Sequence, residues 1–167
     1  IPRSKDLSEY MSDINLYFKN MSKPTDNNLI SLIIPVGTDY PKHILKEKSK
    51  FDKEIKYILI EGNNPSRNRN IGFKKSDTSL VAFVNSHTEL SNSWIKEVRK
   101  YFKKYPEMDI VGGPMLTFKN ETLFGRASGY ALTSFFGVGT VYPRYKRYNE
   151  TKNATEVMLT SANLICR

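Results

Sequence analysis

The sequence predicts an α/β fold with a mostly parallel central sheet and helices on both faces. Three runs, at 29–36, 55–60 and 79–84, are largely apolar, which is typical of strands covered on both sides. Helical patterns alternate with these runs, and this order favours parallel strands joined by crossover helices. With 167 residues, 39% of them hydrophobic, the chain is predicted to form one domain, 1–167.

The N-terminal segment 1–28 is predicted to be a helix followed by a connector. The helix at 5–20 is indicated by apolar residues at helical spacing: Leu7, Tyr10, Met11, Ile14 and Phe18. The polar, proline-containing residues 22–28 are the connector, and the strand at 29–36 follows. Beyond it, 41–50 is expected to be a short basic helix or a loop.

The middle of the chain continues the alternation. The strand at 55–60 precedes a helix expected at 65–75, because Pro65 is tolerated in a first helical turn. After the strand at 79–84, residues 91–105 place apolar side chains on one helix face and lysines on the other.

The last third is predicted from shorter signals. A brief strand at 109–111 ends in two glycines and a proline, and 121–136 has the pattern of another helix. The basic, tyrosine-rich stretch 137–153 is expected to be a loop, and 155–165 the final strand.

Composition limits the classes of function. Because Cys166 is the one cysteine, an internal disulfide framework and a cysteine-based zinc site are excluded. No apolar run approaches the roughly 20 residues that a membrane-spanning helix needs. The formal net charge of +9 suggests an anionic partner, which could be nucleic acid, lipid head groups or a phosphorylated small molecule.

Polar side chains gather where the predicted strands end, which is where ligands bind in open α/β sheets. Glu61 ends the second strand, and Arg67 and Arg69 open the helix behind it, where backbone N–H groups and guanidinium groups favour phosphate. Asn85 and His87 follow the third strand and could share a cation, although Mg²⁺ and Mn²⁺ prefer carboxylates.

These residues, in this order, resemble the family 2 glycosyltransferases, with the resemblance spread over most of the chain. Residues 31–36 are similar to the first strand of that family and 57–61 to the second, and 69–72 match its Arg-Asn-x-Gly signature. Residues 111–114 resemble the strand before the acceptor region, and 161–167 the strand before the catalytic base. The segments 129–137 and 144–145 resemble a subgroup that makes surface polysaccharides.

The resemblance implies an inverting enzyme of the Rossmann-like GT-A fold that uses a nucleotide-diphospho-sugar. It implies a UDP- or GDP-sugar donor and a glycan or lipid-linked acceptor. The residues implied on the nucleotide-sugar side are Pro35, Gly37, Glu61, Arg67, Arg69, Asn70, Asn85 and Ser86. Those implied on the acceptor side are Trp94, Gly113 and Pro114.

The chain departs from the family where its acidic metal-binding motif would lie, because that position reads Asn85-Ser86-His87. Three alternatives stay open. Asn85 and His87 could hold Mn²⁺ or Mg²⁺ weakly, or Arg67 and Arg69 could carry the diphosphate without a metal. Alternatively, the protein could be a degenerate, non-catalytic member that binds a nucleotide-sugar or a glycan.

We also expect the family's catalytic base to lie beyond Arg167, so that 1–167 is the donor-binding part of a truncated catalytic domain. The expected location is cytoplasmic, at the inner face of a membrane if the lysines of the 91–105 helix contact anionic head groups. A basic nucleic-acid-binding module is another alternative, because Tyr145 and Tyr148 lie among basic residues. The chain has no signature of common DNA- or RNA-binding modules, so no nucleic-acid partner is expected.

Overall fold

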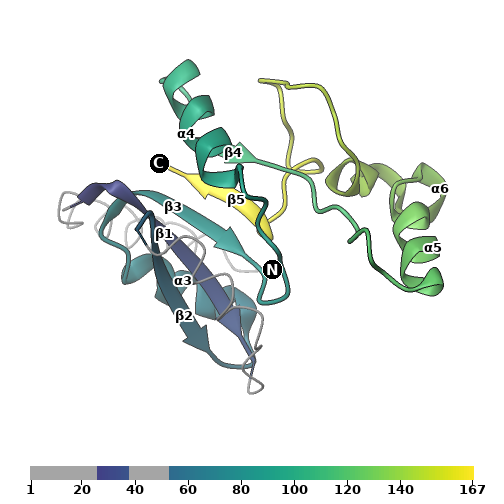
Figure 1. Ribbon diagram of the computed structural model, residues 1–167, viewed down its shortest axis with the longest axis horizontal. Coiled ribbons are helices and arrows are strands. Elements are labelled where there is room, and N and C mark those ends of the chain that lie inside the picture. The colour runs from purple at the N-terminus through teal and green to yellow at the C-terminus, as the bar shows by residue number, and fades with distance from the viewer. Residues whose placement is uncertain (1–25, 38–52) are drawn as a thin grey trace, which may run out of the picture.

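A computed structural model describes residues 26–37 and 53–167 of the chain (Figure 1). Its centre is a five-stranded sheet of order β2-β1-β3-β5-β4. The strands are β1 Asp26–Val36, β2 Ile55–Glu61, β3 Thr78–Val84, β4 Ile110–Gly112 and β5 Asn163–Cys166. The helices predicted at 5–20 and 41–50 lie outside the described residues.

The sheet is mixed, with parallel pairing at its centre. β1 is parallel to both β2 and β3, whereas β5 is antiparallel to both β3 and β4. The predicted α/β fold is therefore confirmed, and the reversal of β5 is a feature that the sequence pattern did not reveal.

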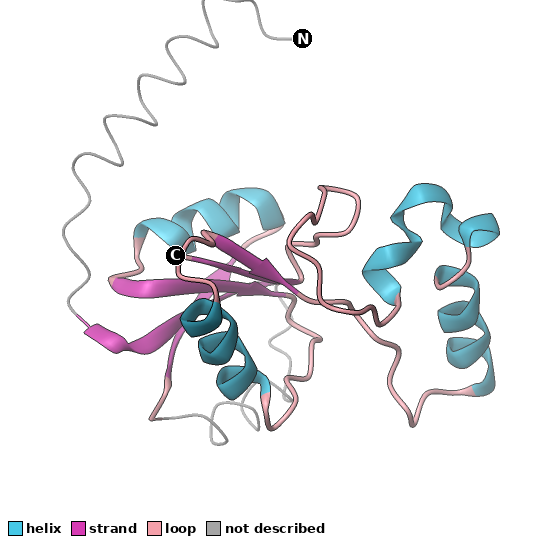
Figure 2. Ribbon diagram, turned by 90° about the horizontal axis from the view of Figure 1, so that it is seen from above, coloured by secondary structure: helices cyan, strands magenta, loops and turns pink. Residues whose placement is uncertain are grey.

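Helices cover both faces of the sheet, as predicted (Figure 2). On one face, Ile33 of β1 packs in a cluster with residues of α3 Pro65–Lys74. On the other, Leu32 and Ile34 pack in a larger cluster with the apolar face of α4 Trp94–Lys104. Successive side chains of β1 point to opposite faces of the sheet and pack in a core on each face. This explains why the sequence of β1 is a continuous apolar run.

Three predicted boundaries differ from the structure. β1 begins at Asp26, within the predicted connector, and pairs there with Thr78 of β3. The helix predicted at 121–136 is two helices, α5 Leu123–Leu132 and α6 Phe135–Val138, because Ser134 caps the second through a bond from the backbone N of Phe136.

The strand predicted at 155–165 was wrong over its first part, because residues 155–162 form turns and β5 begins only at Asn163. The backbone N–H groups of Met158 and Leu159 both donate to the carbonyl of Thr155, which closes the turn.

A helical excursion leaves the sheet between β4 and β5 and stands to one side of it (Figures 1 and 2). It consists of α5, α6 and a 3-10 helix, η1 Gly139–Tyr145. The η1 helix lies within 137–153, which was predicted to be a loop. The returning chain is attached to the end of α4, since Glu150 accepts hydrogen bonds from Lys104 and Tyr105. Among the described residues, no helix is long and apolar enough to cross a membrane.

Candidate functional site

One edge of the sheet gathers the predicted site residues. β1, β2 and β3 end there, because Val36 pairs with Glu61 and Ile33 of β1 pairs with Phe83 of β3. The antiparallel β5 begins at the same edge, where its first residue, Asn163, pairs with Val84. We call this the carboxyl edge, and it is where α/β sheets bind ligands.

The connection from β2 to α3 is held by Asn68, a residue that the sequence analysis did not single out. The Asn68 side chain is buried, and its amide Nδ2 donates to the carbonyls of Ile60 at 3.2 Å and Gly62 at 2.9 Å. Gly62 has φ of +148°, a value that favours glycine. Several asparagines lie nearby in the sequence, so nothing in the pattern distinguished Asn68 from the others.

The start of α3 is capped locally. The side-chain Oδ1 of Asn64 accepts a hydrogen bond of 3.0 Å from the backbone N of Arg67, and Pro65 follows as the first helical residue. Asn68 thus holds α3 against the end of β2, and Asn64 fixes the first turn of the same helix, from which Arg69 extends.

Arg69 and Asn85 are the two predicted site residues that the structure brings into direct contact. The guanidinium NH2 of Arg69 donates to Oδ1 of Asn85 at 2.8 Å, which joins α3 to the end of β3. The Nε of Arg69 is buried and has no hydrogen-bond partner among the described residues. Burial lowers the pKa of Arg69 from its ordinary value, so the charged group lies in a partly desolvated place.

Arg67 does not join this contact. It is exposed, and residues two apart on a helix do not face the same way. Asn70 and Glu61 are exposed as well, whereas Pro35 is half-buried within β1 and Gly37 lies directly after it. The two arginines that the sequence placed together therefore occupy different surroundings.

The segment after β3 is a turn, closed by a bond of 3.1 Å from the backbone N of Thr88 to the carbonyl of Asn85. Ser86 is half-buried and His87 is exposed in this turn. The described residues contain no group of three or more histidine, cysteine or acidic side chains that could hold a metal. Because Oδ1 of Asn85 already binds the Arg69 cation, the described residues around it do not fit a hard divalent cation.

Two of the three residues predicted on the acceptor side, Trp94 and Gly113, meet at Asn163. Trp94 is buried in the core cluster that contains α4, and its Nε1 donates to Oδ1 of Asn163 at 3.1 Å. The backbone N of Gly113 donates to the carbonyl of Asn163 at 3.1 Å, and a Cβ on Gly113 would lie 2.5 Å from the Asn163 Nδ2. Pro114 follows, half-buried.

Asn163 is the second residue that the sequence analysis did not single out, although a polar residue directly before an apolar strand was a usable signal. Further along the excursion, the guanidinium of Arg144 donates to the backbone carbonyl of Glu156 at 2.7 Å. The Nε of Arg144 is also buried and lacks a partner among the described residues.

Comparison with known proteins identifies the family of this chain. No curated protein and no solved structure matches the chain significantly. The model of the family described as glycosyl transferase family 2 matches residues 36–166, which is most of the chain and includes every strand of the sheet in part or in full. The chain therefore belongs to glycosyl transferase family 2.

Proposed function

We propose that the carboxyl edge binds a nucleotide-diphospho-sugar, UDP- or GDP-linked, whose sugar passes with inversion to a glycan or lipid-linked acceptor. The observation that carries this proposal is the contact between Arg69 and Asn85, because it fixes a partly buried guanidinium at the sheet edge. The proposal also draws on family membership, which supports sugar transfer in general.

In this proposal, Arg69 binds the diphosphate of the donor. Its NH2 is held by Asn85, and because the residue as a whole is only half-buried, the remaining terminal N–H groups of the guanidinium are available to a phosphate oxygen. A guanidinium presents several donors in a planar fork that matches phosphate geometry. Partial burial strengthens its attraction for a diphosphate, because electrostatic interactions gain strength where water is excluded.

The chemistry follows from that placement. The acceptor hydroxyl forms a bond to the anomeric carbon while the bond from that carbon to the diphosphate breaks, and the hydroxyl proton passes to a general base. Arg69 stabilises the negative charge that grows on the departing nucleoside diphosphate. No step here passes through a metal ion, since the described residues around Asn85 do not fit one.

Donor binding can be tested by thermal unfolding in the presence of UDP-glucose, UDP-N-acetylglucosamine and GDP-mannose, with EDTA added. A ligand at about 100 times its Kd stabilises the folded state by about 2.7 kcal/mol, so we expect Tm to rise by several degrees with at least one donor. Arg69→Ala should abolish the rise.

Arg67→Ala is the matched control, because Arg67 is an exposed arginine on the same helix. It should retain the rise in Tm. The proposal is wrong if none of the three nucleotide-sugars shifts Tm in EDTA, or if Arg69→Ala shifts as much as the unmodified chain.

A further inference from the structure

The outward face of α5 is apolar. Leu123, Phe124 and Tyr130 expose 77%, 82% and 77% of their surface, and Ala127 and Ala131 on the same helix are exposed too. On a helix, positions 123, 127, 130 and 131 fall on one side. Most of what α5 presents to its surroundings is therefore hydrocarbon.

The inward face of α5 is made by small residues instead. Gly129 is buried, and a Cβ on it would overlap the side chain of Thr117, so α5 approaches the chain before it closely. A surface helix ordinarily turns its apolar stripe inward and its polar side outward. α5 departs from this arrangement, because its large residues Leu123, Phe124 and Tyr130 are on the exposed side.

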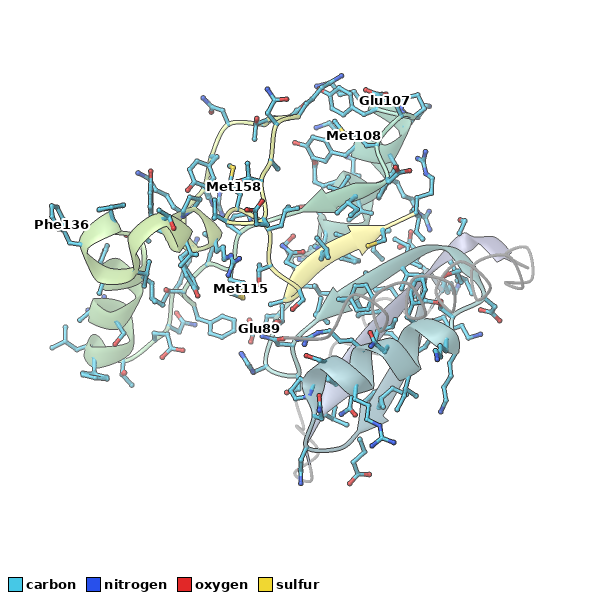
Figure 3. All side chains as sticks on the ribbon, turned by 180° about the vertical axis from the view of Figure 1, so that it is seen from behind. Glu89, Glu107, Met108, Met115, Phe136 and Met158 are labelled. Atoms are coloured by element: carbon cyan, nitrogen blue, oxygen red, sulfur yellow. The ribbon has the colours of Figure 1, made fainter. Side chains whose placement is uncertain are left out.

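α6 extends the same surface. Phe135 and Phe136 expose 58% and 98% of their surface, and their rings meet edge to face with centroids 6.2 Å apart. Figure 3 shows Phe136 at the outer end of the excursion, pointing away from the sheet. We call Leu123, Phe124, Tyr130, Phe135 and Phe136 the α5–α6 surface.

Positive charge accompanies these aromatic residues. The segment 117–148 contains one acidic residue, Glu121. Its basic residues are Lys119, Arg126, Arg144, Lys146 and Arg147. Arg126 lies on α5 and is exposed, as are Lys119, Lys146 and Arg147. Exposed Phe and Leu together with Lys and Arg are typical of helices that lie in a membrane interface.

We propose that the α5–α6 surface docks on an anionic lipid surface, with Phe124 and Phe136 entering the boundary between head groups and acyl chains. The neighbouring basic residues attract acidic head groups. A second copy of this chain suits the surface less well. In a two-fold contact the same patch would face itself, which would bring basic residues against basic residues.

The surface lies on α5 and α6, which stand apart from α3 (Figure 1). α3 is the helix that carries Arg69. Lipid docking therefore goes beyond the proposed donor site. Either proposal can be wrong without the other, because lipid docking is tested by vesicle binding and donor binding is tested by a donor-dependent shift in Tm.

The test is co-sedimentation of the 167-residue chain with vesicles. We expect binding to vesicles of equal parts phosphatidylglycerol and phosphatidylcholine, and much less binding to phosphatidylcholine alone. Phe136→Ser and, separately, Phe124→Ser should each reduce the bound fraction by severalfold. Both side chains are exposed, so Tm should not change, and the two variants on different helices guard against a local folding defect in one of them.

Matched controls separate this surface from the rest of the protein. Ile110→Thr removes an apolar side chain that is 48% exposed on β4, and it should leave vesicle binding unchanged. Lys119→Gln with Arg126→Gln should weaken binding to acidic vesicles more than Lys96→Gln with Lys103→Gln, a pair exposed on α4.

Three results would overturn the proposal. One is absence of binding to the acidic vesicles, and a second is binding that both serine variants retain in full. The third is reversible self-association, seen by sedimentation velocity without lipid and abolished by Phe136→Ser, because it would assign the surface to a second copy.

Discussion

Gly72 of α3 lies so close to Ile33 of β1 that a Cβ on the glycine would overlap Cγ2 of the isoleucine. Gly72→Ala should lower the free energy of unfolding by about 1–3 kcal/mol, because overpacking outweighs the gain of up to about 1 kcal/mol that alanine brings to a helix. Urea unfolding measures the change.

Gly125→Ala is the control for that variant, since its Cβ would meet chiefly the flexible Glu121 side chain, with the Glu121 Oε2 nearest at 2.6 Å. It should be neutral or slightly stabilising. If Gly72→Ala were equally harmless, α3 could not pack on β1 as closely as described. In the double variant with Ile33→Ala, the loss in free energy of unfolding should be smaller than the sum of the losses in the two single variants.

Asn68→Ala should destabilise the protein by about 2 kcal/mol, because it removes both hydrogen bonds that join α3 to the carbonyls of Ile60 and Gly62. Asn70→Ala, an exposed change on the same helix, should stay within about 0.5 kcal/mol of the unmodified chain. Equal effects of the two substitutions in urea unfolding would contradict the anchoring role of Asn68.

Asn85→Asp should weaken donor binding in EDTA about tenfold, a loss of about 1.4 kcal/mol. The new carboxylate would pair with Arg69 and neutralise the positive charge of its guanidinium, which binds the diphosphate in the proposed function. Isothermal titration calorimetry with the donor that gives the largest shift measures this. Wild-type binding that requires Mn²⁺ would argue against the metal-free site.

Cys166 gives a prediction about alkaline pH. Burial raises the pKa of its thiol in the folded protein. Below the ordinary value of about 8.5, both the folded and the unfolded chain hold the proton. Above it, the unfolded chain releases its proton first, so the free energy of unfolding falls as pH rises until the folded thiol also ionises.

Cys166→Ala should therefore show a smaller loss of stability between pH of about 7.5 and about 9.5 than the unmodified chain. Urea unfolding at both pH values gives the two differences. Equal differences in the two proteins would show that the thiol pKa is not raised.

The core of the fold was predictable because its signals are strong and local. The continuous apolar run of β1 and the one-sided apolar face of α4 each have one simple interpretation, and both elements form near the expected residues. By contrast, Val157, Met158 and Leu159 are apolar yet lie in turns, where Leu159 packs against Gly112. A short apolar run does not say whether it will pair with a strand.

The candidate site was predictable in its location but not in its contacts. Strand ends identified the carboxyl edge, since that rule depends only on the order of elements. Which of Arg67 and Arg69 would reach Asn85 depends on how α3 is rotated, and the buried Asn68 and the tight approach at Gly72 set that rotation. Such three-dimensional constraints leave no periodic signal in the sequence.

The reversed strand β5 has a consequence for how this protein can change over evolutionary time. β4 and β5 are neighbours, and Gly112 pairs with Leu164, so the excursion 113–162 leaves the sheet and re-enters it at the same place. Residues in that excursion can be inserted, deleted or exchanged without altering the order of the strands. The strands β1, β2 and β3, next to which Arg69 and Asn85 lie, can stay constant while the residues of the excursion change.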